Sequence, residues 1–103
     1  MIIKGKQSLP TTQDGPIERT VEVRDKDGLH MRPAMEFVDC ANQFVSRISV
    51  CKEDRCVDGK SIMQMTTLIA VQGTRLKIIA EGEDAAQAVA SLVKVLENEA
   101  VEK

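Results

Sequence analysis

The segment Gly28–Ala34 reads GLHMRPA and holds the chain's only histidine, His30, with Arg32 two positions later. Pro33 is typical of a first helical turn, and the positive end of a helix dipole keeps a nearby imidazole neutral and nucleophilic. The amides of a helix start also bind anions, and a guanidinium group matches phosphate oxygens. A nucleophile, an anion-binding helix start and a cation in one place favour transient phosphorylation of the histidine.

A structural interpretation of the same residues is also open. His30 would then be a surface side chain that caps the first helix, and Arg32 would simply be solvated. A second motif bears on this choice, because residues 59–63 read GKSIM and place Ser61 31 residues after His30. Ser61 also begins the S-x-x-Q pattern of a capping box, so a helix-capping role is expected for it in any case.

Both motifs resemble those of the HPr family, the histidine phosphocarriers of the phosphoenolpyruvate-dependent phosphotransferase system. GLHMRPA is similar to the family's active-site loop G-[LI]-H-A-R-P-A, and GKSIM is similar to its regulatory seryl motif. The stretch 72–97 resembles the family's last strand and helix, so the resemblance covers about residues 17–99. Met31 departs from the pattern, because the family has a small residue after the histidine.

The resemblance implies that His30 accepts a phosphoryl group at Nδ1 from Enzyme I and passes it to an Enzyme II A domain. It implies that Arg32 positions the phosphate and that an HPr kinase/phosphorylase modifies Ser61. Such a protein is a covalent carrier without turnover of its own, and it needs no metal or cofactor. The alternative is a regulatory relative outside sugar uptake, either a nitrogen-type relay or a seryl-phosphorylated transcriptional co-effector. The retained histidine loop argues against a purely regulatory protein, whereas the sequence does not separate a nitrogen-type relay from sugar transport.

Apolar side chains near the two motifs exceed what a short helix can bury, so an exposed apolar rim close to His30 is expected. Such a rim, edged by basic side chains, fits a surface that docks several partners. The expected docking residues are Met31, Met35, Lys60, Ile62 and Met63.

Hydrophobic periodicity predicts the elements that position these motifs. Alternating patterns indicate strands over residues 18–25, 45–51, 55–57 and 74–80. Helical spacing and capping signals indicate helices over about 33–43, from Ser61 to about 68, and after an N-cap at Asp84. Each strand has one polar face, so three helices should cover one face of a four-stranded, mostly antiparallel sheet. This α+β fold, an open-faced β-sandwich of order βαββαβα, is also what the HPr resemblance implies.

Composition sets the remaining limits. Residues 1–16 are polar and contain two of the three prolines, which predicts a loosely ordered extension before a domain over 17–103. A net charge of −2, two phenylalanines and no tyrosine or tryptophan argue against nucleic-acid binding. No apolar run is long enough to span a membrane, and the first residues lack a signal-peptide core, so a cytoplasmic protein is expected.

The three cysteines form no C-x-x-C motif, and with one histidine they supply a zinc site poorly. We expect reduced thiols. The alternative is that Cys51 and Cys56 face each other across a hairpin and have a redox role.

Overall fold

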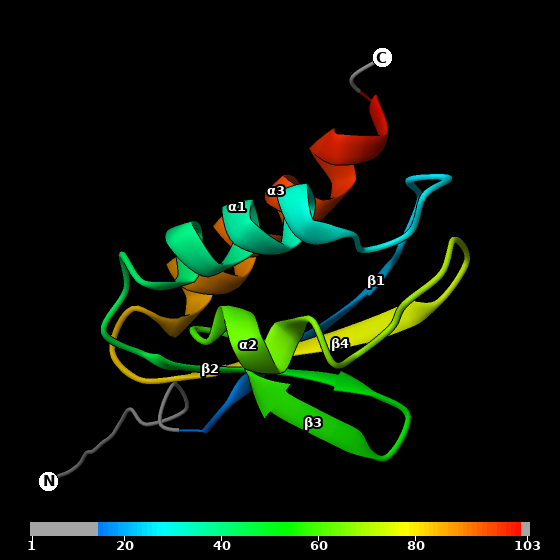
Figure 1. Cartoon of the computed structure of the whole chain (residues 1–103). Helices are drawn as coiled ribbons and strands as arrows, with labels where there is room; N and C mark the ends of the chain where they lie inside the picture. Colours follow the sequence, from blue (N-terminus) through cyan, green and yellow to red (C-terminus); the bar gives the residue numbers. More distant parts are fainter. Residues whose placement is uncertain (1–14, 102–103) are drawn as a thin grey trace, which may run out of the picture.

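The computed structural model describes residues 15–101, with side chains up to residue 97 (Figure 1). The elements are β1 (Ile17–Glu22), α1 (Met31–Ala41), β2 (Arg47–Lys52), β3 (Arg55–Asp58), α2 (Ile62–Met65), β4 (Arg75–Glu81) and α3 (Ala85–Val101). This confirms the predicted order. The expected extension over residues 1–16 lies, except for Gly15 and Pro16, outside the described residues. No helix in the described part of the chain is long and apolar enough to cross a membrane.

The four strands form one sheet in the order β1-β4-β2-β3. All three neighbouring pairs are antiparallel. The helices lie together on one face of this sheet, with α1 beside α3, and no helix or strand of residues 15–101 covers the other face (Figure 1). The predicted α+β open-faced sandwich is therefore confirmed.

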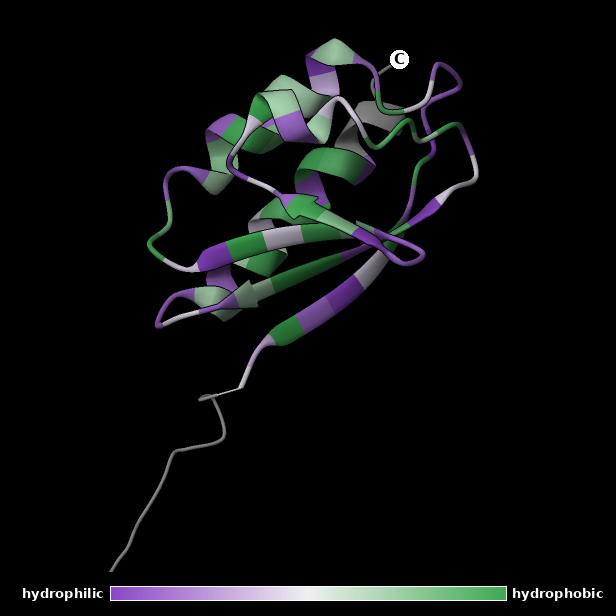
Figure 2. Cartoon of the chain, turned by 60° about the horizontal axis from the view of Figure 1, so that its bottom comes forward, coloured by the Kyte–Doolittle hydropathy of each residue, from purple (hydrophilic) through white to green (hydrophobic). Residues whose placement is uncertain are grey.

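The core lies between the sheet and the helices. Phe37 of α1, Leu76 and Ile78 of β4 and Leu92 of α3 are all fully buried in it. Hydrophobic and hydrophilic residues alternate along the strands, as Figure 2 shows, because successive side chains of a strand point to opposite faces. The buried side chains of α1, such as Phe37, pack against this core and fix the helix on the sheet. The start of α1 is held in place with the rest of the helix.

The segment before β2 is shaped by a carboxylate from a distant part of the chain. Asp84 accepts hydrogen bonds from the amides of Val45 and Ser46, both at 3.0 Å, and from the Ser46 hydroxyl. These bonds, led by that of the Ser46 hydroxyl, hold the pKa of the Asp84 carboxyl below its usual range. The amides of Val45 and Ser46, which were expected to pair within the sheet, thus donate to the Asp84 carboxylate instead. The strand β2 therefore begins at Arg47 and not at residue 45. Asp84 lies directly before α3, as predicted, and its backbone carbonyl accepts the Ala88 amide. Its carboxylate, however, binds the segment before β2.

The helix α2 is shorter than predicted and ends at Met65. The hydroxyl of Thr66 donates to the Met63 carbonyl at 2.8 Å, and that of Thr67 donates to the Gln64 carbonyl at 2.6 Å. Such local bonds compete with continuation of a helix. They satisfy carbonyl groups that a longer helix would have paired with later amides.

The expectation of reduced thiols is wrong for two of the three cysteines. Cys51 and Cys56 form a disulfide, and Cys40 is free. The pairing follows from the β2–β3 hairpin, in which Lys52 pairs with Arg55 and Cys51 lies directly opposite Cys56. Directly opposed residues of an antiparallel pair bring their side chains close together. Burial raises the pKa of the remaining Cys40 thiol.

Candidate functional site

The loop that carries His30 is fixed against the segment before β4. The Leu29 amide donates to the Ala70 carbonyl at 2.8 Å, and the His30 amide donates to the Gly28 carbonyl at 3.0 Å. Gly28 has a φ of +76°, and a Cβ atom there would collide with the Ala70 carbonyl oxygen. Glycine is therefore required at this position by its backbone angle and by the close approach of residue 70.

His30 occupies the N-cap position of α1 with an extended backbone, φ −86° and ψ −171°. Its carbonyl accepts the Ala34 amide at 3.1 Å, which starts the helix. His30 is thus the N-cap residue, as the structural interpretation expects, but its ring makes no capping hydrogen bond. The helix begins two residues earlier than predicted, which places Pro33 in its first turn, where a proline costs no intrahelical bond.

The ring of His30 faces Asp25, a residue that sequence reasoning missed. Its Nε2 lies 3.4 Å from Asp25 Oδ2, and the two side chains are 35% and 17% exposed. Asp25 Oδ1 accepts the Asp27 amide at 2.8 Å. This amide, and to a lesser extent His30, lowers the pKa of the Asp25 carboxyl, against the opposing effect of burial. A D-x-D-G sequence before the histidine was the available signal, since Asp favours such side-chain-closed turns.

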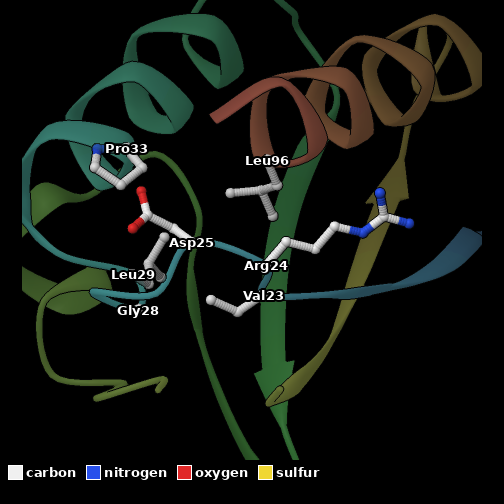
Figure 3. Close-up of a pocket in the computed structure, with 7 residues that line it drawn as sticks. All are labelled: Val23, Arg24, Asp25, Gly28, Leu29, Pro33 and Leu96. Carbon is white, nitrogen blue, oxygen red and sulfur yellow. The ribbon is translucent and has the colours of Figure 1, made fainter. Parts of the chain in front are cut away.

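Asp25 lies in a small crevice at the start of α1. It is lined by Val23, Arg24, Asp25, Gly28, Leu29, Pro33 and Leu96. Figure 3 shows the carboxylate of Asp25 pointing toward Pro33, whereas the Arg24 side chain extends away to the other side. The half-buried carboxylate of Asp25 thus contacts both the turn after β1, through the Asp27 amide, and the start of α1, through the His30 ring.

Arg32 lies in the first turn of α1, two residues from His30, with its side chain 59% exposed. Its Nη1 is 3.7 Å from Glu36 Oε2, an i,i+4 pair on the helix surface. Exposed pairs of this kind are weak, so the guanidinium can exchange this partner for an anion held at the helix start.

Ser61 is at the N-cap of α2, as predicted, and its Oγ accepts the Gln64 amide at 3.2 Å. The reciprocal half of the predicted capping box does not form in the usual way. Gln64 Oε1 accepts the Asp58 amide at 3.0 Å, while the Ser61 amide donates to the Asp58 carbonyl. The cap is therefore built together with the end of β3.

The predicted docking residues differ in how far they reach solvent. Met31, Met35 and Met63 are 55%, 49% and 78% exposed, whereas Ile62 is partly buried against the core. The Nζ of Lys60 donates to the Phe44 carbonyl at 2.7 Å. Two further exposed apolar side chains, missed by sequence reasoning, flank Ala70 beside the His30 loop; they are Ile69 and Val71.

Within the described part of the chain, one group of side chains could supply three ligands to a metal ion: Asp25, Asp27 and His30. Their candidate ligand atoms lie within 4.8 Å of one another. Exposed acidic groups commonly lie this close without an ion, so proximity alone assigns no metal.

Comparisons with known proteins agree on one family. The family model described as "PTS HPr component phosphorylation site" matches residues 17–98. The chain is 42% identical over 78 residues to the phosphocarrier protein HPr of Haemophilus influenzae, covering 76% of this chain and 92% of that protein. It is 40% identical over 83 residues to the HPr-like protein Crh of Bacillus subtilis, covering 81% of this chain and 98% of that protein.

A much longer protein also matches over part of its length. A multiphosphoryl transfer protein of Haemophilus influenzae is 39% identical over 99 residues, which are 91% of this chain but only 20% of that protein. Among solved structures, an HPr of Thermoanaerobacter tengcongensis matches with a TM-score of 0.80 and 41% identity, covering 84% of this chain and 98% of that one. By sequence and by fold, this chain belongs to the HPr family of phosphocarrier proteins of the phosphotransferase system.

Proposed function

We propose that this chain is a phosphocarrier in which His30 accepts a phosphoryl group from phosphorylated Enzyme I and passes it to Enzyme II A domains. The observation that carries the proposal is the placement of His30. It sits at the N-cap of α1, makes no capping bond and has Arg32 two residues away in the first helical turn. The helix dipole and the guanidinium favour an incoming anion at this place, and the ring remains available as the nucleophile.

The residues around the site have distinct proposed roles. Arg32 positions the phosphoryl group, and Ser61 is the regulatory phosphorylation site of an HPr kinase/phosphorylase. The exposed methionines Met31, Met35 and Met63, with Lys60 and Ile62, form the surface that docks the partners. The phosphocarrier domain comprises residues 17–103, works without a metal or cofactor and serves partners in the cytoplasm.

The chemistry is a transfer without net turnover by this chain. A ring nitrogen of His30 attacks the phosphorus, a nitrogen–phosphorus bond forms, and the bond to the donor breaks. In the second step the new bond breaks, its electron pair returns to the ring, and the phosphoryl group leaves with the acceptor. A proton on the other ring nitrogen makes the ring a good leaving group in this step.

Incubation with phosphoenolpyruvate and Enzyme I, followed by intact-mass analysis, tests the proposal. We expect one added phosphoryl group that is lost at acidic pH, and no label on His30→Ala. The matched control is Ser61→Ala, which should still be labelled. Stoichiometric labelling that persists in His30→Ala would overturn the proposal.

A second function is supported by the similarity to the HPr-like protein Crh. The chain would then act as a regulatory protein, through a nitrogen-type relay or through Ser61 phosphorylation as a transcriptional co-effector, outside sugar uptake. A kinase assay with ATP, run beside the Enzyme I assay, separates the co-effector from a histidine relay. A chain labelled at Ser61 but never at His30 is a seryl-phosphorylated regulator, whereas labelling at His30 that passes to an Enzyme II A domain identifies a relay.

A further inference from the structure

We propose that Asp25 is a positioning residue that holds the His30 ring with its proton on Nε2 and so leaves Nδ1 as the nucleophile. The inference rests on the proposed phosphoryl transfer and adds a residue to it. The contact that carries it is the 3.4 Å approach of Asp25 Oδ2 to His30 Nε2.

The carboxylate is held in place before it meets the ring. Its other oxygen, Oδ1, accepts the Asp27 amide at 2.8 Å, and its backbone carbonyl accepts the Gly28 amide at 2.8 Å. Both bonds close the turn that follows β1. Because Leu29 is in turn bonded to the Ala70 carbonyl, the carboxylate and the ring are fixed by the same loop.

The choice of nitrogen follows from what each group can donate. An ionised carboxylate only accepts hydrogen bonds, so a bond to Nε2 requires a proton on that nitrogen. A neutral imidazole carries one proton, and with Nε2 protonated its lone pair is on Nδ1. The neighbouring carboxylate thus decides which nitrogen attacks.

The same contact acts during transfer. When the Nδ1 lone pair of a ring protonated at Nε2 forms a bond to phosphorus, the ring gains a positive charge while the phosphoryl group keeps its negative charges. A carboxylate bonded to the far nitrogen stabilises such a cation and keeps its proton in place. On the onward step the Nδ1–phosphorus bond breaks, its electron pair returns to Nδ1, and the proton on Nε2 does not have to move.

Three variants test this role. Asp25→Ala removes the acceptor, whereas Asp25→Asn keeps an oxygen that can accept from Nε2 but removes the charge. Asp27→Asn is the matched control, because it removes a carboxylate from the same turn and leaves the amide that bonds Asp25. Heteronuclear NMR of ¹⁵N-histidine-labelled protein reports the tautomer of the neutral ring, and labelling by phosphorylated Enzyme I reports the transfer rate.

We expect the native ring to be mainly the Nε2–H form and the Asp25→Ala ring to be a mixture. Labelling of Asp25→Ala should slow about tenfold, a fold-change of the size seen when a supporting residue behind a site is removed. Asp25→Asn should keep the tautomer and recover part of the rate, and Asp27→Asn should match the native protein in both.

An unchanged tautomer and rate in Asp25→Ala would overturn the inference. Loss of folding in Asp25→Ala, seen by NMR, leaves the test to Asp25→Asn, whose rate must then fall below that of Asp27→Asn. Failure of the native protein to accept any phosphoryl group overturns the proposed function instead, and the tautomer of the native and variant rings still decides the role of Asp25.

Discussion

The helices α1 and α2 each start with a polar residue at the N-cap, and the two starts are built differently. At α2, Ser61 Oγ accepts the Gln64 amide, so the helix satisfies an amide of its first turn from its own sequence. At α1, His30 takes the same position with an extended backbone but makes no such bond, and its ring turns to Asp25. A capped start is complete in itself, whereas an uncapped start keeps its amides and dipole for a visiting anion.

The missing cap has a cost that the packing of α1 offsets. A side-chain cap contributes about 1 kcal/mol to a helix. Pro33, Ala34, Phe37, Val38 and Ala41 are the residues that α1 buries against the rest of the molecule. Tertiary packing of an apolar stripe supplies most of the stability of a helix in a protein. α1 therefore stays in place although its first turn has no side-chain cap.

The largest effect we expect within this comparison is on phosphoryl transfer when the cation of the uncapped start is removed. Arg32→Ala should slow labelling by roughly 10- to 100-fold, less than the loss of a buried oxyanion donor, because the guanidinium is exposed. The free energy of unfolding should change by no more than about 0.5 kcal/mol, as for most surface substitutions. Stopped-flow transfer from phosphorylated Enzyme I and urea unfolding measure the two quantities.

The control for Arg32 is Arg24→Ala. Arg24 is also exposed and lies near the same loop, but its side chain extends away from Asp25 in Figure 3. The transfer rate of Arg24→Ala should stay within about twofold of the parent, since among the described contacts none joins the Arg24 side chain to the proposed phosphoryl site. Equal rates for Arg32→Ala and Arg24→Ala would mean that the α1 start does not use its cation.

The residues at the starts of α1 and α2 could be predicted from the sequence, because the motifs that identify them span only a few neighbouring positions. The residues of the α1 start lie within six positions: Gly28, His30, Arg32 and Pro33. Ser61 and the S-x-x-Q spacing predict the start of α2. The order of elements followed from periodicity for the same reason. What could not be predicted depends on the geometry of a turn or on distant partners.

The contact of Asp25 with His30 depends on the geometry of a turn and could not be predicted from the sequence. It exists only because the turn after β1 folds back through Gly28. Asp84 illustrates the dependence on distant partners, because its carboxylate binds amides nearly forty positions earlier in the chain. The disulfide required the register of a hairpin, in which a shift of one residue separates Cys51 from Cys56. Sequence spacing could offer that pairing only as an alternative.

A smaller effect concerns the anchoring of the capped start. The hairpin before α2 is closed by the Cys51–Cys56 disulfide, and Arg55 Nη2 donates to Thr67 Oγ1 at 2.8 Å just beyond α2. Cys56→Ser should lower the free energy of unfolding by about 2 kcal/mol, the value expected for a short closed loop. Labelling at His30 should be unchanged, because the hairpin shares no hydrogen bond with the His30 loop among the described contacts.

Thermal or urea unfolding with and without a thiol reductant measures this effect. The reductant should destabilise the native protein to the level of Cys56→Ser and leave that variant unaffected. Cys40→Ser serves as the control, since it removes the free thiol and keeps the disulfide. A large loss of labelling on reduction would contradict the separation of the two helix starts.

The smallest expected effect is that of a charge added to the capped start. Ser61→Asp should keep near-parental stability, because an Asp side chain caps as well as Ser, and it should raise the apparent KM for Enzyme I by a few-fold. The reason is that a negative charge beside the exposed Met63 adds a desolvation cost to any complex that buries this surface. Ser61→Asn is the matched control, since it caps without charge and should keep the parental KM. Parental transfer kinetics in both variants would show that Ser61 acts only as the cap of α2, and the comparison would then reduce to one chemical start and one structural start.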